Sequence, residues 1–240
     1  MTGLTFDISA QPDPTTCGPT CLQAVYRHYR DDIDLTDVIG EARALDSGGT
    51  LGALLGVHAL KRGYRAVLYT YNLEVFDPTW FRLTRSEMKQ RMKRRMEANP
   101  GRHRLQVATQ AYLDFLDLGG EVRCTDLSPR LVRRLLDEER PVLTGLSATW
   151  LYDEAREIGA TNTPNDVLGE PAGHFVVLTG YDERSAKVSV ADPLQPNALA
   201  RDGLYAVAIS RLITAVLLGV LTYDANLLQI RPARPKRGEA

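Results

Sequence analysis

Three residues that can carry nucleophilic catalysis are widely spaced along the sequence: Cys17 near its start, and His174 and Asp192 towards its end. Cys17 follows a Pro-rich, extended segment, and Gly18 and Pro19 come directly after it. This pattern is typical of the first turn of a helix. Unpaired N–H groups and the positive end of the helix dipole favour a thiolate over a thiol there. The sequence therefore predicts that Cys17 is an activated nucleophile.

Four histidines are available as the base that such a nucleophile needs. His28 lies 11 residues beyond Cys17 in the same predicted helix, about 16 Å along its axis, and cannot reach the thiol. His58 sits among apolar residues of another predicted helix and is expected to pack or to face solvent. His103 belongs to a basic segment. His174 opens the most apolar strand of the second half, so we predict that it is the base.

Two further side chains complete the predicted site. Asp192 follows the strand that pairs with the strand of His174, and hairpin pairing can bring its carboxylate alongside the imidazole to orient it. Gln11, six residues before Cys17, can place its side-chain amide beside the sulfur. Together with the N–H of Cys17, this amide can stabilise an oxyanion. Cys17, His174 and Asp192 then satisfy the logic of a catalytic triad, and Gln11 adds the oxyanion donor.

Each assignment has a structural alternative. A free cysteine is most often a small buried hydrophobe, and Asp before Pro commonly caps a turn. Cys21, one turn after Cys17, is expected to point into the core behind the nucleophile, and Cys124 is expected in the core on a short strand. A metal site through Cys17, Cys21 and a histidine is a weak alternative, because Cys-x3-Cys without a nearby His pair is poor ligand spacing.

The elements that must position these residues form a helical front half and a strand-rich back half. We predict helices over 18–30, 36–45, 51–61 (with Thr50 as N-cap), 105–118 and 210–218, another helix from Ser128-Pro129, and strands over 65–71, 121–125, 141–146, 174–180, 187–191, 204–209 and 226–230. The expected fold class is α+β, with a helical front half packed on an antiparallel sheet from the back half, in one domain over residues 1–230.

A basic helical insertion is expected at about 72–104, and a basic, disordered tail at 231–240. Between residues 82 and 104, nine Lys or Arg face two Glu, and three methionines are spaced by four: Met88, Met92 and Met96. The favoured interpretation is a solvated face with the methionines packed on the body. A site for an acidic partner remains the alternative. Nucleic-acid binding is disfavoured, because the segment lacks interleaved aromatic residues.

Composition narrows the class of protein. The 240 residues are 44% hydrophobic and 25% charged, with 29 Lys plus Arg against 30 Asp plus Glu. These values exclude intrinsic disorder, a collagen and a globally basic nucleic-acid binder. Three cysteines are poor material for a disulfide framework, and neither a signal peptide nor a membrane span is recognisable. We therefore expect a cytoplasmic protein, and no cofactor, since nucleotide-binding and zinc-protease motifs are missing.

The motifs also resemble a known family. The string QPDPTTCGPTCL at 11–22, with GHFVVLTGYD and VSVADP far downstream, is similar to the bacteriocin-leader-processing cysteine peptidases (peptidase family thirty-nine), a branch of the papain-like superfamily. The resemblance implies a papain-like fold and cleavage of a peptide bond through a thioester. It also implies that Cys17 is the nucleophile, His174 the base, Asp192 its orienting group and Gln11 the oxyanion donor.

The predicted function is therefore a cysteine peptidase or amidohydrolase with a peptide or amide substrate. Two alternatives remain: an acyl transferase using the same thioester, as in the related phytochelatin synthases, and a non-catalytic peptide-binding module. The last is disfavoured because all four site residues are present. The loop over 151–173 carries five carboxylates against Arg156 and precedes His174. We hypothesise that this acidic loop helps to select the substrate.

Overall fold

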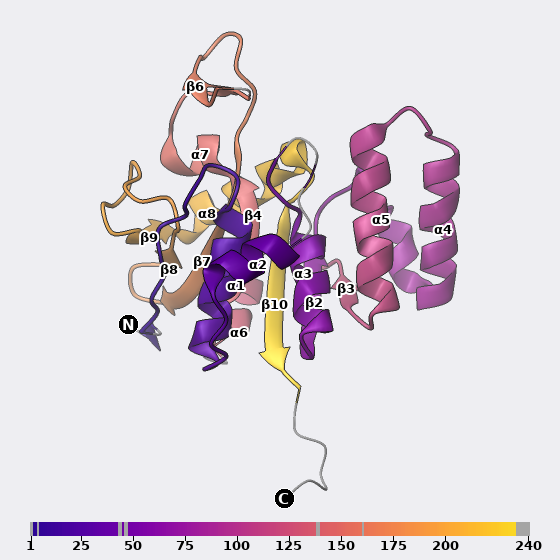
Figure 1. The fold of residues 1–240 in the computed structure, drawn as a ribbon, viewed down its shortest axis with the longest axis horizontal. Coiled ribbons are helices and arrows are strands. Elements are labelled where there is room, and N and C mark those ends of the chain that lie inside the picture. The colour runs from indigo at the N-terminus through magenta and orange to yellow at the C-terminus, as the bar shows by residue number, and fades with distance from the viewer. Residues whose placement is uncertain are drawn as a thin grey trace, which may run out of the picture.

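A mixed β-sheet forms the centre of the computed structural model, which describes residues 2–3, 5–42, 45, 48–137, 140–159 and 161–233. Eight strands of this described chain lie in the order β3-β2-β10-β4-β7-β8-β9, with β1 beside β7 (Figure 1). Their bounds are Thr2–Gly3 (β1), Tyr64–Thr70 (β2), Glu121–Arg123 (β3), Val142–Ser147 (β4), Gly173–Asp182 (β7), Lys187–Ala191 (β8), Leu204–Ala208 (β9) and Asn226–Pro232 (β10).

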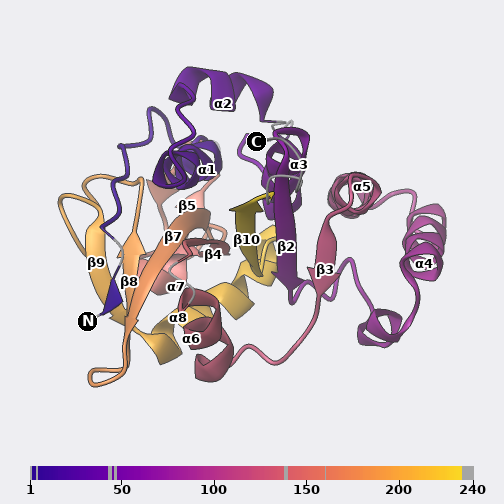
Figure 2. The same ribbon diagram turned by 90° about the horizontal axis from the view of Figure 1, so that it is seen from below.

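Helices cover both faces of this sheet (Figure 2). On one face lie α1 (Cys17–His28) and α3 (Gly52–Lys61), with α2 (Leu35–Glu41) beyond them; the other face carries α6 (Pro129–Leu136), α7 (Ala148–Tyr152), α8 (Ile209–Leu218) and the 3-10 helix η2 (Gly219–Thr222). Each face has its own core, with Leu22 and Leu55 fully buried in the first and Leu151 and Leu212 in the second. The predicted α+β class is confirmed.

The basic segment forms the helix α4 (Arg85–Glu97), which lies with α5 (His103–Asp117) at the β3 edge of the sheet (Figure 1). The 3-10 helix η1 (Pro78–Arg82) precedes it. Thr84 and Glu87 form a capping box that starts α4. Met88 and Met92 are buried in the core of the first face, and Met96 packs against it. The predicted packing of the methionines on the body is confirmed.

Several predicted boundaries are wrong. The sheet is not built by the back half alone, because β1 and β2 join it, and β2 runs parallel to β3. A parallel pair needs a long crossover, which the segment with α4 and α5 supplies. The predicted helix over 36–45 ends at Glu41, and residues 43 and 44 lie outside the described residues. The strand β10 runs on to Pro232, into the predicted tail, whose residues 234–240 lie outside the described residues.

The acidic segment before His174 is not a plain loop. It begins in α7 and contains the short paired strands β5 (Glu157–Ile158) and β6 (Thr163–Pro164). A bridge between Glu157 and Glu170 closes its base. The segment therefore projects from the sheet as a supported β-ribbon (Figure 1). Across the described residues, we find no helix with the length and apolar character that crossing a membrane requires.

Candidate active site

The first turn of α1 delivers Cys17 to a cleft. The N-cap residue Thr16 exchanges hydrogen bonds with Asp13, and its side chain makes no capping bond to the helix. The N–H groups at the helix start are therefore not satisfied by a side-chain cap. Gly18 lets this turn pack closely, since a Cβ there would stand 2.6 Å from Cγ2 of Thr50. The thiol of Cys17 lines the cleft, and the residue is 8% exposed.

The hairpin of β7 and β8 delivers His174 and Asp192 to the same place. Val177 pairs with Ala191, so Asp192 comes two positions diagonally from His174 on the same face. Nε2 of His174 lies 2.8 Å from Oδ1 of Asp192, and both side chains are buried. The structure thus brings together two residues that stand 18 positions apart in the sequence.

Four donors surround the carboxylate of Asp192, which is 0% exposed. Besides His174, Oδ1 accepts the N–H of Leu194 at 2.9 Å, and Oδ2 accepts the hydroxyls of Tyr152 at 2.7 Å and Tyr205 at 2.5 Å. Burial alone would raise the pKa of Asp192, but these hydrogen bonds and the charge of the imidazole hold it below its ordinary value. Asp192 is therefore ionised. Sequence analysis missed both tyrosines, since nothing in their spacing marks them.

The imidazole also interacts with Cys17, which helps to raise the pKa of His174. Because Asp192 occupies Nε2, the ring nitrogen left for the sulfur is Nδ1. Burial opposes the charged ring, but the hydrogen bonds and charges of Asp192 and Cys17 outweigh it and raise the pKa of His174 to about 10. The geometry favours an imidazolium held between a carboxylate and a sulfur.

Gln11 lies at the rim of the same cleft. Its backbone N–H donates to the carbonyl of Pro193 at 2.8 Å, which ties the N-terminal segment to the turn after Asp192. Its side-chain Nε2 donates to the carbonyl of Asp13 at 2.8 Å, and its Oε1 is buried without a hydrogen-bond partner. One amide N–H of Gln11 therefore remains available.

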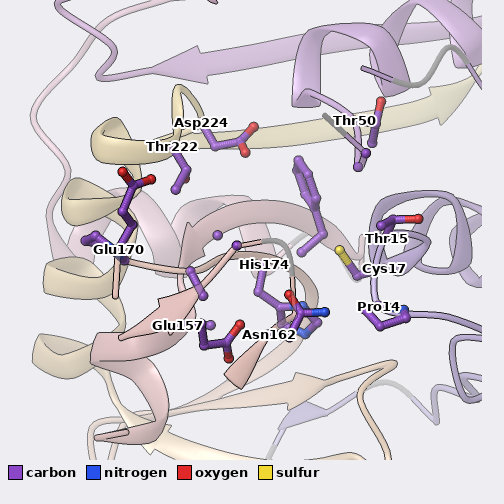
Figure 3. A pocket seen from close by; sticks show the side chains of 18 of the residues that line it. Pro14, Thr15, Cys17, Thr50, Glu157, Asn162, Glu170, His174, Thr222 and Asp224 are labelled. Atoms are coloured by element: carbon purple, nitrogen blue, oxygen red, sulfur yellow. The ribbon is translucent and has the colours of Figure 1, made fainter. Parts of the chain in front are cut away.

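The cleft has a volume of about 1230 Å³. Figure 3 shows Cys17 with Pro14 and Thr15 on one side, and Glu157 and Glu170 on the other, with His174 between them. Asp192 lies behind His174 and does not line the cleft. His103, assigned from the sequence only to the basic segment, lines it from the start of α5. A cleft of this size can accommodate several residues of an extended peptide.

The remaining cysteines and His58 lie outside this arrangement. Cys21 is fully buried, donates its S–H to the carbonyl of Phe175, and has its pKa raised by burial, so its predicted core position is confirmed. Cys124 follows β3 and is only partly buried, so its predicted core position on a strand is wrong. His58 packs against Tyr26, whose hydroxyl lies 2.8 Å from Nδ1. Nowhere in the described chain do three His, Cys, Asp or Glu side chains group to hold a metal.

Asp224, which the sequence gave no reason to single out, is buried in the wall of the cleft. The helix α3 has Leu51 as its N-cap, and no side chain of its own caps it. The predicted N-cap at Thr50 is therefore wrong. Oδ1 of Asp224 accepts the N–H of Gly52 at 3.2 Å instead, across 172 positions of sequence. This contact joins the start of α3 to the turn after η2.

Residues 102–205 match the model of the Peptidase_C39 like family. This region, less than half of the 240-residue chain, is similar to that family. It contains His174 and Asp192 and does not include Gln11 and Cys17. A search of curated proteins finds no match.

One solved structure supports the fold, and two others are more distantly similar. A protein described as a C39-like peptidase from Bacillus anthracis is 14% identical, with a TM-score of 0.51 and 96% of each chain covered. Xylellain, a cysteine protease from Xylella fastidiosa, is 15% identical with a TM-score of 0.47, covering 96% of this chain and 84% of its own. A double-glycine-motif protease from an AMS/PCAT transporter, solved with the leader peptide, is 13% identical with a TM-score of 0.47, covering 96% and 94%. The resemblance predicted from the motifs is confirmed.

Proposed function

We propose that this chain hydrolyses a peptide or amide bond through a thioester on Cys17. One observation carries the proposal: the imidazole of His174 lies 2.8 Å from the buried carboxylate of Asp192 and also interacts with Cys17, whose hydrogen bonding and charge help to raise the pKa of His174. This is the arrangement in which a base both activates a sulfur nucleophile and is itself oriented by a third group. The exposure of Cys17 to a large cleft gives a substrate access to the sulfur.

In the acylation step, the thiolate of Cys17 attacks the carbonyl carbon of the substrate and forms a C–S bond. The tetrahedral intermediate collapses as the imidazolium of His174 donates its Nδ1 proton to the leaving nitrogen, and the C–N bond breaks. The amine product leaves, and the acyl group stays on the sulfur as a thioester. Asp192 keeps the ring oriented and stabilises its cationic form.

In the deacylation step, neutral His174 takes a proton from water at Nδ1, and the resulting hydroxide adds to the thioester carbon. The C–S bond then breaks, the acid product leaves, and the thiolate and imidazolium are restored. An amine in place of water would give acyl transfer by the same steps. Hydrolysis is the proposal, and an acceptor other than water would appear directly in product masses when hydroxylamine is added.

Stabilisation of the oxyanion falls to Gln11 in this proposal, together with the N–H of Cys17. Two observations support this role: Gln11 lines the cleft with Cys17, and its backbone is fixed to Pro193. Its second amide hydrogen has no partner to give up before it binds an oxyanion. Gln11→Ala would remove this donor, whereas Gln11→Glu would place a carboxylate beside the developing negative charge.

The decisive experiment measures where a small electrophile reacts. Sub-stoichiometric iodoacetamide near neutral pH, followed by intact mass and peptide mapping, is expected to label Cys17 and to spare Cys124 and Cys21. His174→Ala should slow this labelling on the order of tenfold or more, because the imidazolium no longer stabilises the thiolate. The matched control is His103→Ala, which removes a histidine that also lines the cleft.

Two results would contradict the proposal. Equal labelling of Cys124 and Cys17 would mean that Cys17 is not activated, and a His174→Ala variant as reactive as the parent would mean that the imidazole does not act on the sulfur. Either result would favour the non-catalytic peptide-binding module. Loss of reactivity in His103→Ala as well would indicate a general effect of charge in the cleft.

A further inference from the structure

The position of Asp224 in the cleft wall is tightly fixed. It follows Tyr223, whose carbonyl accepts a hydrogen bond from Nδ2 of Asn72 at 2.8 Å. The N–H of Asp224 donates to the carbonyl of Gly219 at 3.1 Å. Gly145 makes room for the side chain, because a Cβ there would stand 2.7 Å from Cβ of Asp224. The carboxyl group is therefore held in place before any ligand arrives.

The hydrogen bonds of Asp224 all fall on one oxygen. Oδ1 accepts the N–H of Gly52 and the Nδ2–H of Asn226, each at 3.2 Å. Oδ2 has no hydrogen-bond partner among the described residues, although the residue is only 5% exposed and lines the cleft. Figure 3 shows the carboxyl group beside Thr222, on the same wall. An oxygen of a buried residue that reaches a cleft without a protein partner is open to a hydrogen-bond donor on a ligand.

Capping α3 does not by itself explain an aspartate. An asparagine would offer the same oxygen to Gly52 and Asn226 without a charge to bury. Burial destabilises the charged form of Asp224. Its effect outweighs that of the two hydrogen bonds and raises the pKa of Asp224 to about 7. The charge of Asp224 also helps to raise the pKa of Tyr112, a buried neutral phenol. Burial thus destabilises the ionised form of the Asp224 carboxyl group. Its position in a binding cleft therefore points to a ligand that stabilises the ionised form.

The rest of the cleft has the same sign of charge. One guanidinium, that of Arg104, lines the cleft together with the imidazoles of His103 and His174. Five carboxylates also line it: those of Asp13, Glu154, Glu157, Glu170 and Asp224. Figure 3 shows Glu157, Glu170 and Asp224 on the side away from Cys17. An acidic cleft of this kind attracts cations and repels anionic peptides.

We propose that Asp224 binds a cationic nitrogen of the substrate, an ammonium or guanidinium group such as a Lys or Arg side chain provides. This inference rests on the proposed function, because it names the substrate class of the same cleft. Oδ2 of Asp224 accepts a hydrogen bond from the cation, and Glu157 and Glu170 guide it by charge from the rim. The substrate is thus a basic peptide or an amide that carries an amine.

The test uses paired peptidyl chloromethyl ketones, in which the sulfur displaces chloride from the methylene carbon next to the ketone and a covalent thioether adduct remains. In each pair, one position on the acyl side carries either lysine or norleucine, which has nearly the same shape without the charge. Four positions next to the ketone are scanned, and the rate constant for modification of Cys17 is followed by intact mass. The measured quantity is the ratio of the lysine rate to the norleucine rate.

At one position, the native chain is expected to prefer lysine on the order of 10- to 100-fold, the range for a hydrogen bond to a charged group. Asp224→Asn should bring this ratio close to one at that position. Asp126→Asn, which removes an exposed carboxylate that does not line the cleft, should leave the ratio unchanged.

The outcomes separate the two proposals. Modification of Cys17 by every probe with no lysine preference at any position would overturn the role of Asp224 and leave the peptidase proposal intact. A lysine preference that survives Asp224→Asn would assign the selectivity to Glu157 and Glu170 and would also overturn it. If no probe modifies Cys17 faster than Cys124, the proposed function fails and this inference fails with it.

Discussion

Replacement of Asp224 by asparagine should stabilise the protein at neutral pH. Burial raises the pKa of this carboxyl from its ordinary value of 3.8 to about 7. In the folded protein the group therefore stays protonated over a range in which the unfolded chain has already lost the proton. Asparagine keeps the oxygen that Gly52 and Asn226 bond to and carries no charge. The variant should thus retain the cap of α3 and avoid the free-energy cost of ionising a buried carboxyl group.

The sign and size of the effect follow from linkage. Below pH 3.8 the carboxyl is protonated in both states, and the two proteins should be equally stable. As pH rises from 3.8 to about 7, only the unfolded native chain releases a proton, so the native protein loses stability relative to the variant. At about 1.4 kcal/mol per pKa unit, the difference approaches about 4 kcal/mol above pH 7. Because Oδ2 faces the cleft, hydration can reduce this to about 2 kcal/mol.

The assay is urea unfolding of both proteins at intervals between pH 4 and pH 8.5. All other titrating groups are shared, so they cancel in the difference between the two free energies of unfolding. A difference that grows with pH and levels off above about pH 7 supports the argument. A difference that is flat with pH would refute it, because Asp224 would then ionise as freely in the folded protein as in the unfolded chain.

Three other substitutions test the packing around the site. Tyr205→Phe should lower the free energy of unfolding by about 1.5–3 kcal/mol, as measured by urea unfolding, because the ionised Asp192 loses a donor. Met92→Ala should lower the free energy of unfolding by about 2–5 kcal/mol by the same measurement, because this methionine of α4 is fully buried. The iodoacetamide reactivity of the site should stay intact. Gly145→Ala should lower the free energy of unfolding by about 1–3 kcal/mol, because the added Cβ displaces Asp224. The same displacement should lower the preference of the protein for lysine in the chloromethyl ketones.

The catalytic part of the site was accessible to sequence reasoning because short-range rules act there. Gly18 and Pro19 mark a helix start and so predict Cys17 in a first turn, and α1 begins at Cys17. The hairpin was predictable from two apolar runs joined by a turn, and its register carries Asp192 to His174. Each of these inferences needs only the residues within one element or one turn.

The rest of the cleft depends on contacts that no local pattern records. Asp224 stands beside Gly52 only because β10 lies between β2 and β4, a sheet order that the sequence does not specify. Tyr152 and Tyr205 reach the same oxygen of Asp192 from a helix and an edge strand. Cys124 was misplaced for a related reason: β3 lies at the sheet edge and ends one residue earlier, so its thiol is only partly buried.

The pKa values of the two buried aspartates in this site are shifted in opposite directions, and the number of hydrogen-bond donors around each carboxyl group decides the direction. Asp192 accepts four hydrogen bonds spread over both oxygens, so its charge is stabilised and its pKa is held low. Asp224 accepts two, both on Oδ1, and its pKa rises to about 7. The first can act as a permanent negative charge behind His174, whereas the second becomes fully charged only when a further donor arrives. A cation bound at Oδ2 would supply that donor and release a proton from Asp224 near pH 7. Substrate binding should therefore be weaker on the acidic side of this pH, and Asp224→Asn should abolish the dependence.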